Sequence, residues 1–176
     1  MTVSGRHRVA SVAVTGATGF IGGYIVRDLL ARGLHVVGVV RNPAKGAALA
    51  AAGVELREAD LQDPGALARA FDGVDAVVAN AAMVSVGGRS LDDLIRTNLQ
   101  GTDNVLEAMA QAGVQRCVMM SSAAAYQAKS GHIYVESDPL RDPSRRVHRV
   151  LYYSVSKAAA ERHAWERAAE LHLDLT

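Results

Sequence analysis

The stretch that decides the fold is "VAVTGATGFIGGYIVRDLLARG", residues 12–33. It reads as a short apolar strand, a glycine-rich turn and an amphipathic helix. Gly16, Gly19 and Gly22 follow the spacing G-x-x-G-x-x-G. The first glycine suits a tight turn, the second lets backbone approach a pyrophosphate, and the third lets the helix pack on the strand. A plain glycine turn is the alternative, but the flanking strand and helix favour a phosphate-binding loop at a helix N-terminus.

The rest of the chain repeats this strand–helix rhythm. We expect strands at 9–14, 35–40, 54–57, 74–79 and 114–120, and helices near 20–32, 44–52, 64–71, 91–112 and 152–171. Most strand runs are apolar almost throughout, as expected of strands covered on both faces. The alternation predicts an α/β fold with a doubly wound parallel sheet, the Rossmann fold. Four glycines are expected to end helices: Gly33, Gly53, Gly73 and Gly113.

Composition limits the classes of function. The 176 residues fit one domain, and we interpret 1–176 as a dinucleotide-binding domain. The net charge of +1, without a charged block, argues against nucleic-acid or membrane partners. No apolar run approaches the ~20 residues of a membrane span. The single cysteine, Cys117, fits a cytoplasmic protein, and the scattered histidines predict no metal site.

The residues after the second and third strands bear on the choice of cofactor. Many NAD-binding units end the second strand with an acidic residue that holds the ribose 2′-hydroxyl. Here the strand is followed by Arg41, with Lys45 close behind. A guanidinium suits a 2′-phosphate, so we favour NADP over NAD; the alternative is a solvated arginine. Asp60 either accepts a hydrogen bond from the adenine amino group or caps the next turn.

Several motifs together carry a family resemblance. They are "TGATGFIGG" (15–23), "ADLQD" (59–63), "NAA" (80–82), "NLQGTDNVLEA" (98–108), "SSAAAY" (121–126) and "YSVSK" (153–157). They resemble the extended short-chain dehydrogenase/reductase family, in its epimerase/dehydratase-like branch. The segment "VVRNPAK" (39–45) is most similar to reductases of the dihydroflavonol-reductase type.

The resemblance implies an NAD(P)-dependent oxidoreductase. It would transfer a hydride between the nicotinamide and a carbonyl or secondary alcohol of a small molecule. A nucleotide-sugar epimerase and a non-catalytic NADP-binding protein are the alternatives. The implied cofactor-binding residues are Gly16, Thr18, Gly19, Phe20, Ile21, Gly22, Arg41, Lys45, Asp60, Leu61, Asn80, Ala81, Ala82, Tyr153 and Lys157.

The spacing in "VLYYSVSK" (150–157) distinguishes two adjacent tyrosines. A tyrosine with a pKa near ~10 needs a neighbouring cation to act as an acid/base at neutral pH. Residues four apart share a helix face, as Tyr153 and Lys157 do. Tyr152 and Lys157 are five apart, about 140° around the helix. Tyr153 is therefore the expected acid/base.

The resemblance implies further roles and some departures. Ser122, with Ser121 as the alternative, matches the hydroxyl that binds the substrate oxygen. Asn98 matches an asparagine that supports a proton relay through water; otherwise it is a helix residue bonded to backbone. Ala123 and Ala124 replace an acidic pair of the family's dehydratases, which disfavours a 4,6-dehydratase.

The family also implies features beyond the single site. The last residues, "LHLDLT" (171–176), read as the start of another strand. We therefore expect a sheet that is incomplete at the C-terminus and lacks most of the family's C-terminal substrate domain. The resemblance implies a homodimer through the helices near 91–112 and 153–171; the alternative is that these helices pack within the chain.

Overall fold

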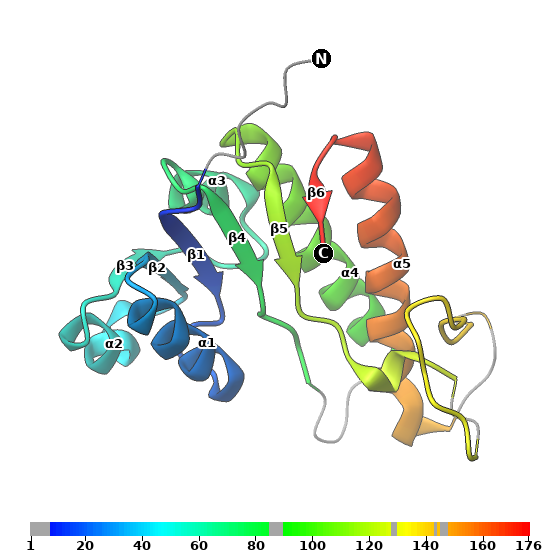
Figure 1. Ribbon diagram of the computed structural model, residues 1–176. Helices are drawn as coiled ribbons and strands as arrows, with labels where there is room; N and C mark the ends of the chain where they lie inside the picture. Colours follow the sequence, from blue (N-terminus) through cyan, green and yellow to red (C-terminus); the bar gives the residue numbers. More distant parts are fainter. Residues whose placement is uncertain (1–7, 85–89, 128–129, 143, 145–147) are drawn as a thin grey trace.

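The computed structural model contains a six-stranded parallel sheet in the order β3-β2-β1-β4-β5-β6 (Figure 1). It describes residues 8–84, 90–127, 130–142, 144 and 148–176. The strands are β1 (Ser11–Thr15), β2 (His35–Val40), β3 (Glu55–Glu58), β4 (Ala76–Ala79), β5 (Arg116–Met119) and β6 (Asp174–Leu175). This strand order confirms the predicted Rossmann fold, in which the order reverses between β1 and β4.

A helix connects each strand to the next along the chain, as parallel strands require. They are α1 (Phe20–Ala31), α2 (Ala47–Ala51), α3 (Pro64–Phe71), α4 (Leu91–Gln111) and α5 (Tyr152–Glu170). The described residues also form three short 3₁₀ turns: η1 (Pro43–Gly46), η2 (Ala123–Ala125) and η3 (Arg149–Leu151). The expected helix near 44–52 is therefore divided between η1 and α2.

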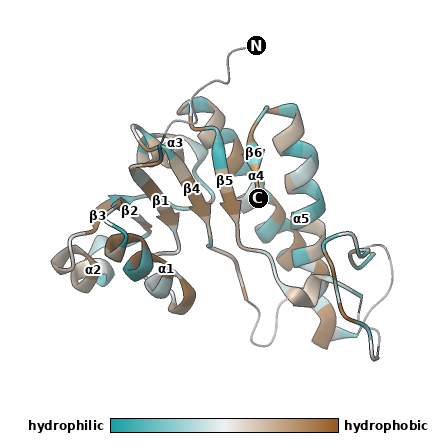
Figure 2. Cartoon of the chain, in the orientation of Figure 1, coloured by the Kyte–Doolittle hydropathy of each residue, from teal (hydrophilic) through white to brown (hydrophobic). Residues whose placement is uncertain are grey.

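The two faces of the sheet bury different layers of side chains. Along β1, Val12 and Val14 join a cluster with α1, whereas Ala13 joins a cluster with α3, α4 and α5. This alternation follows from the two-residue period of a strand. Figure 2 shows β1 and β4 largely in the hydrophobic colours of its scale. Both faces of β1 are therefore buried, as its apolar sequence predicts.

Local sequence explains where the helices begin. The Asp63 carboxylate accepts a hydrogen bond from the N–H of Ala66 at 2.9 Å, and Pro64 follows it at the start of α3. The Ser90 hydroxyl accepts from the N–H of Asp93 at 3.1 Å and caps α4. Such caps satisfy N–H groups that have no partner within the helix. Helix α1 differs, because its N-cap is Gly19 and no side chain in the described part of the chain caps it.

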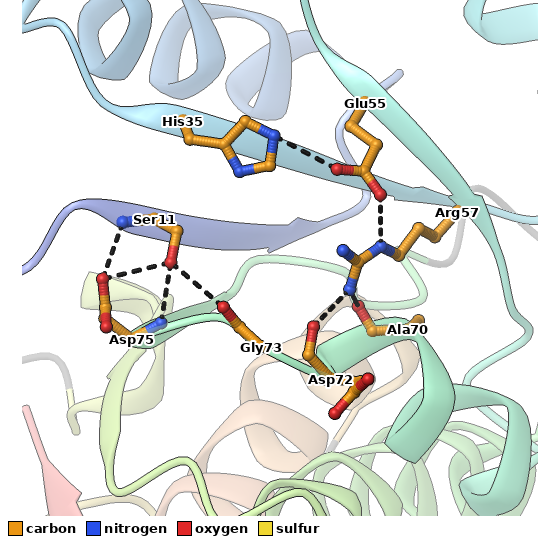
Figure 3. A network of polar contacts seen from close by, with 8 residues as sticks. All are labelled: Ser11, His35, Glu55, Arg57, Ala70, Asp72, Gly73 and Asp75. Carbon is orange, nitrogen blue, oxygen red and sulfur yellow. Dashed lines mark hydrogen bonds and ion pairs between the residues drawn. The ribbon is translucent and has the colours of Figure 1, made fainter.

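A polar network organises the edge where β1, β2 and β4 begin (Figure 3). Asp75 accepts hydrogen bonds from the N–H groups of Ala10 and Ser11, both at 2.8 Å. Arg57 donates to the carbonyl oxygens of Ala70 and Asp72. Because the glycine loop follows the opposite end of β1, this network stabilises the fold away from the site.

Two further expectations for the fold are confirmed. Gly33, Gly53, Gly73 and Gly113 all have positive φ angles and follow helices or precede strands as expected. The strand-like end of the chain pairs with β5, with Leu175 opposite Cys117. Each helix in the described ranges falls short of the length and apolarity that crossing a membrane requires.

Candidate functional site

The glycine loop is closely packed against the turn after β4. Gly16 has a φ of +67°, in the left-handed region that favours glycine. A Cβ atom on Gly16 would lie 3.1 Å from Cα of Ala81 and 3.2 Å from the side-chain nitrogen of Asn80. A Cβ atom on Gly22 would lie only 2.1 Å from the Gly16 carbonyl oxygen. The loop therefore requires glycine at both positions.

The start of α1 is suited to a phosphate group. Among the described residues, no side chain caps its first turn, and its first two residues, Phe20 and Ile21, are exposed. Thr18 and Gly19 of the preceding turn are exposed as well. Backbone N–H groups at the positive end of the helix dipole are thus available to an anion. This arrangement fits the pyrophosphate of a dinucleotide, as the sequence predicts.

Thr15 joins the ends of β1 and β4, although the sequence reasoning gave it no role. Its buried hydroxyl accepts hydrogen bonds from the N–H groups of Asn80 and Ala81, both at 3.0 Å. The Asn80 side chain donates back to the carbonyl oxygens of Thr15 and Gly16, at 3.3 and 3.5 Å. These bonds fix the turn after β4 beside the glycine loop. The position of a threonine directly before the glycine loop was the sequence signal that could have indicated this role.

Asn98 links α4 to two other segments. It is 6% exposed, and its side-chain amide bonds both backbone groups of Met83: the oxygen accepts at 2.8 Å and the nitrogen donates at 3.1 Å. The same nitrogen donates to the Ser156 hydroxyl at 3.0 Å. Asn98 therefore bonds to the backbone, which was the predicted alternative to a proton relay. It also bonds to a side chain of α5. Its part in a proton relay stays a prediction.

Lys157 is buried on α5, with 4% of its surface exposed. Its ammonium donates to the carbonyl oxygen of Met120 at 2.7 Å. Burial lowers the pKa of Lys157 from its ordinary value, and the Glu161 carboxylate partly opposes this shift. A buried lysine with a lowered pKa is typical of functional sites, although structural positions also show one.

Tyr153 lies one helical turn before Lys157, so α5 presents the two residues at the expected i, i+4 spacing. Its ring is half-buried, as is that of Tyr152. The Ser156 hydroxyl, which accepts from Asn98, donates to the carbonyl oxygen of Tyr153 at 2.8 Å. A hydrogen-bonded chain therefore runs from Met83 through Asn98 and Ser156 to the backbone of Tyr153.

The two serines after β5 have different partners. The Ser121 hydroxyl donates to the Glu161 carboxylate on α5. The Ser122 hydroxyl caps η2 by accepting from the N–H of Ala124 at 3.2 Å. Sequence reasoning missed Glu161, which lies one turn beyond Lys157.

A pocket at the carboxyl ends of β1 and β4 brings part of the predicted site together. Its lining residues are Thr15, Ala79, Ala81, Ala82, Asn98, Gly101, Thr102, Val105, Met119 and Lys157. Four of the predicted site residues are among them: Ala81, Ala82, Asn98 and Lys157. The pocket lies where the strand order reverses, which is where ligands bind in open α/β sheets.

The residues predicted to hold the adenosine end are not among those that line this pocket. Arg41 directly follows β2 and Lys45 lies in η1, and both side chains are exposed. Asp60 accepts from the N–H of Gln62 at 2.9 Å, so it caps a turn, which was one of its two expected roles. The carbonyl oxygen of the half-buried Leu61 accepts from the Asn104 side chain at 2.7 Å. Asn104 thereby fixes the turn after β3.

The fold, the glycine loop and the pocket at the strand reversal are together typical of dinucleotide-binding α/β proteins. The model of the NAD dependent epimerase/dehydratase family matches residues 12–176. The chain therefore belongs to this family, within the extended short-chain dehydrogenases/reductases, as its motifs indicated. Members of the family bind NAD or NADP.

The proteins to which the chain is similar include reductases and epimerases. Cinnamoyl-CoA reductase 1 of Oryza sativa subsp. japonica is 36% identical, over 93% of this chain and 50% of the relative. Vestitone reductase from alfalfa (Medicago sativa L.) matches with a TM-score of 0.78 at 26% identity, over 94% of this chain and 55% of that chain. The NAD complex of UDP-glucose 4-epimerase from Thermus thermophilus matches with a TM-score of 0.75 at 34% identity, over 94% of this chain and 53% of that chain. The chain thus spans about half the length of the curated relatives it matches.

Proposed function

We propose that this chain provides the dinucleotide-binding domain and the proton-transfer residues of an NADP-dependent reductase that acts on a carbonyl group of a small molecule. One observation carries the proposal: buried Lys157 and Asn98 line the same pocket as the end of the glycine-loop strand. The pocket therefore adjoins both the phosphate-binding loop and the helix that bears Tyr153. The similarity to cinnamoyl-CoA reductase and vestitone reductase supports a reductase.

In this proposal, individual side chains each carry out a separate part of the carbonyl reduction. The nicotinamide, when bound, supplies a hydride to the carbonyl carbon. Tyr153 donates its phenolic proton to the carbonyl oxygen, which yields the alcohol. The Lys157 ammonium stabilises the phenolate that remains, because its positive charge attracts the negative charge on the phenolate oxygen. Ser122 donates a hydrogen bond to the same oxygen and stabilises the charge that develops there.

Asn98 has a positioning part in this scheme. Its bonds to Met83 and Ser156 hold the turn after β4 against α5. Ser156 in turn bonds the backbone of Tyr153. Asn98 thereby fixes the helix that carries the acid/base relative to the cofactor segment Asn80–Ala82. The water relay implied by the family resemblance would begin from the same pocket.

Arg41 and Lys45 support the choice of NADP over NAD. Both are exposed cations at the carboxyl end of β2, where the family places the ribose 2′ position. A guanidinium binds a phosphate through two parallel hydrogen bonds and stays charged at every working pH. NAD remains the alternative cofactor.

A nucleotide-sugar epimerase is the second candidate. The similarity to UDP-glucose 4-epimerase favours it, since this structure is 34% identical to the chain. The two functions differ in whether cofactor is consumed: a reductase oxidises NADPH, whereas an epimerase returns its cofactor unchanged.

The test measures binding first and turnover second. The protein is titrated with NADPH and NADH by fluorescence, then assayed with a panel of ketones and aldehydes and with UDP-glucose. We expect NADPH to bind more tightly than NADH and to be oxidised by at least one unconjugated carbonyl compound. Interconversion of UDP-sugars without net cofactor use would support the epimerase instead. Cofactor binding without either turnover would contradict both.

We also propose that the protein forms a homodimer through α4 and α5. We propose further that it is located in the cytoplasm. The two helices pack along one another within the chain, which is the alternative to a dimer that the sequence left open (Figure 1). Trp165 on α5 is nevertheless 52% exposed and can contact a second copy. A buried free thiol, Cys117, supports a reducing compartment. Light scattering should give the mass of two chains, and Trp165→Glu should shift it to one. A monomer at all concentrations would contradict the dimer.

A further inference from the structure

The adjacent hydroxyls of Ser121 and Ser122 differ in whether they can still donate a hydrogen bond to a ligand. Ser121 donates its proton to the Glu161 carboxylate. Ser122 accepts from the N–H of Ala124 at 3.2 Å, and within the described residues its own proton has no acceptor. Ser122 is therefore the hydroxyl of the pair that can still donate.

Glu161 and Lys157 form hydrogen bonds with two consecutive residues of the loop after β5. Lys157 donates to the carbonyl oxygen of Met120, and one helical turn later Glu161 accepts from the hydroxyl of Ser121. Successive turns of α5 thus contact successive residues after β5. This double contact fixes the register of the loop against the helix that bears Tyr153.

The position of Glu161 also places its charge within reach of the site. Its carboxylate opposes the lowering of the Lys157 pKa that burial causes. Together with burial, which is the larger cause, it raises the pKa of Tyr126. Glu161 is half-buried, so solvent screens this charge less than it would at the surface.

We propose that Glu161 is a positioning residue that holds Ser121 against α5 and thereby leaves Ser122 as the hydroxyl that binds the substrate oxygen. The inference rests on the proposed reductase function, since it assigns a residue of the same site. It deepens that function by separating the tasks of two adjacent serines. Released from Glu161, Ser121 would be free to rotate and the loop free to shift relative to α5.

The first test measures the loop without any turnover. The N–H groups of Ala124, Ala125 and Tyr126 are all hydrogen-bonded within the loop, so their hydrogen exchange reports its order. In Glu161→Ala we expect these amides to exchange at least about tenfold faster. Glu166→Gln, an exposed site on the same helix, is the matched control and should leave them unchanged. Unchanged exchange in Glu161→Ala would overturn the inference.

The second test measures carbonyl reduction with NADPH by the whole protein. Ser122→Ala should lose about 10²- to 10³-fold in kcat, as expected for a lost donor to the developing charge. Glu161→Ala should lose about tenfold to hundredfold in kcat through misplacement, with the Kd for NADPH unchanged. Glu161→Gln keeps an acceptor for Ser121 and should recover most of that loss.

The outcomes separate the inference from the function it rests on. A wild-type protein that reduces no carbonyl compound defeats the proposed function, and hydrogen exchange alone then decides the role of Glu161. With an active wild type, an equal loss in Ser121→Ala and Ser122→Ala would overturn the inference. A Glu161→Gln variant as inactive as Glu161→Ala would overturn it too, because the hydrogen bond would not be what matters.

Discussion

Gly22→Ala should damage both the fold and cofactor binding, because the added methyl group has no space. An ideal Cβ at this position lies 2.1 Å from the Gly16 carbonyl oxygen, whereas ordinary contacts lie at 3.4–4 Å. The two atoms would have to separate by about 1.3 Å, which moves the start of α1 away from the glycine loop. The Gly16 oxygen is a backbone atom, and the backbone of Gly22 fixes where its Cβ would lie. Rotation of a side chain therefore cannot relieve the contact.

Gly23→Ala is the matched control, one residue further along the same helix. A Cβ there meets nothing within 4 Å. It should stabilise the protein by about 0.5–1 kcal/mol, because alanine favours a helix over glycine. Gly22→Ala gains the same helix preference but suffers overpacking of about 1–3 kcal/mol or more. The two variants should therefore differ in free energy of unfolding by about 1–3 kcal/mol.

Urea unfolding, thermal unfolding and NADPH titration together measure this difference. For a chain of this length about 1 kcal/mol corresponds to about 2–4 °C in Tm, so Gly22→Ala should melt several degrees below Gly23→Ala. The Kd for NADPH should rise at least about tenfold in Gly22→Ala, since a shift of this size removes aligned N–H groups from the phosphates. Equal stability and equal NADPH affinity in the two variants would refute the reasoning.

Two further predictions concern charge. Arg41→Ala should weaken NADPH binding at least about tenfold and leave NADH binding unchanged, because only NADPH carries the 2′-phosphate; an unchanged preference would refute the role of Arg41. Burial raises the pKa of the Cys117 thiol from 9.0 to about 12, so the unfolded chain releases this proton first and stability falls as pH rises above about 9. Between about pH 8 and about pH 10.5 the wild type should lose about 2 kcal/mol more unfolding free energy than Cys117→Ala. Parallel pH profiles for the two proteins would contradict this.

The fold was largely readable from the sequence because its signals are local. The continuous apolar run at 35–40 became β2 with the predicted bounds. The run at 9–14 was misplaced at both ends: β1 begins at Ser11 and includes Thr15. Thr15 reads as polar, but its hydroxyl is bonded to the turn after β4, so tertiary contacts decided this boundary.

The site could be predicted only in part from the sequence, because its contacts join segments that are far apart in the chain. The bond between Asn98 and Ser156 spans 58 residues, and that between Ser121 and Glu161 spans 40. No period or motif indicates such pairings, whereas the i, i+4 relation of Tyr153 and Lys157 follows from helix geometry alone. The glycine loop was predictable for the same local reason. The catalytic roles themselves stay predictions.

The most direct test of the account compares Tyr153→Phe with Tyr152→Phe. Both changes remove one phenolic hydroxyl from the first turn of α5 and keep the ring. Each variant is assayed for carbonyl reduction and titrated with NADPH. We expect Tyr153→Phe to lose at least about 10²-fold in kcat with little change in NADPH affinity, and Tyr152→Phe to stay near wild type. Loss of turnover in Tyr152→Phe with retained activity in Tyr153→Phe would contradict the assignment of the acid/base.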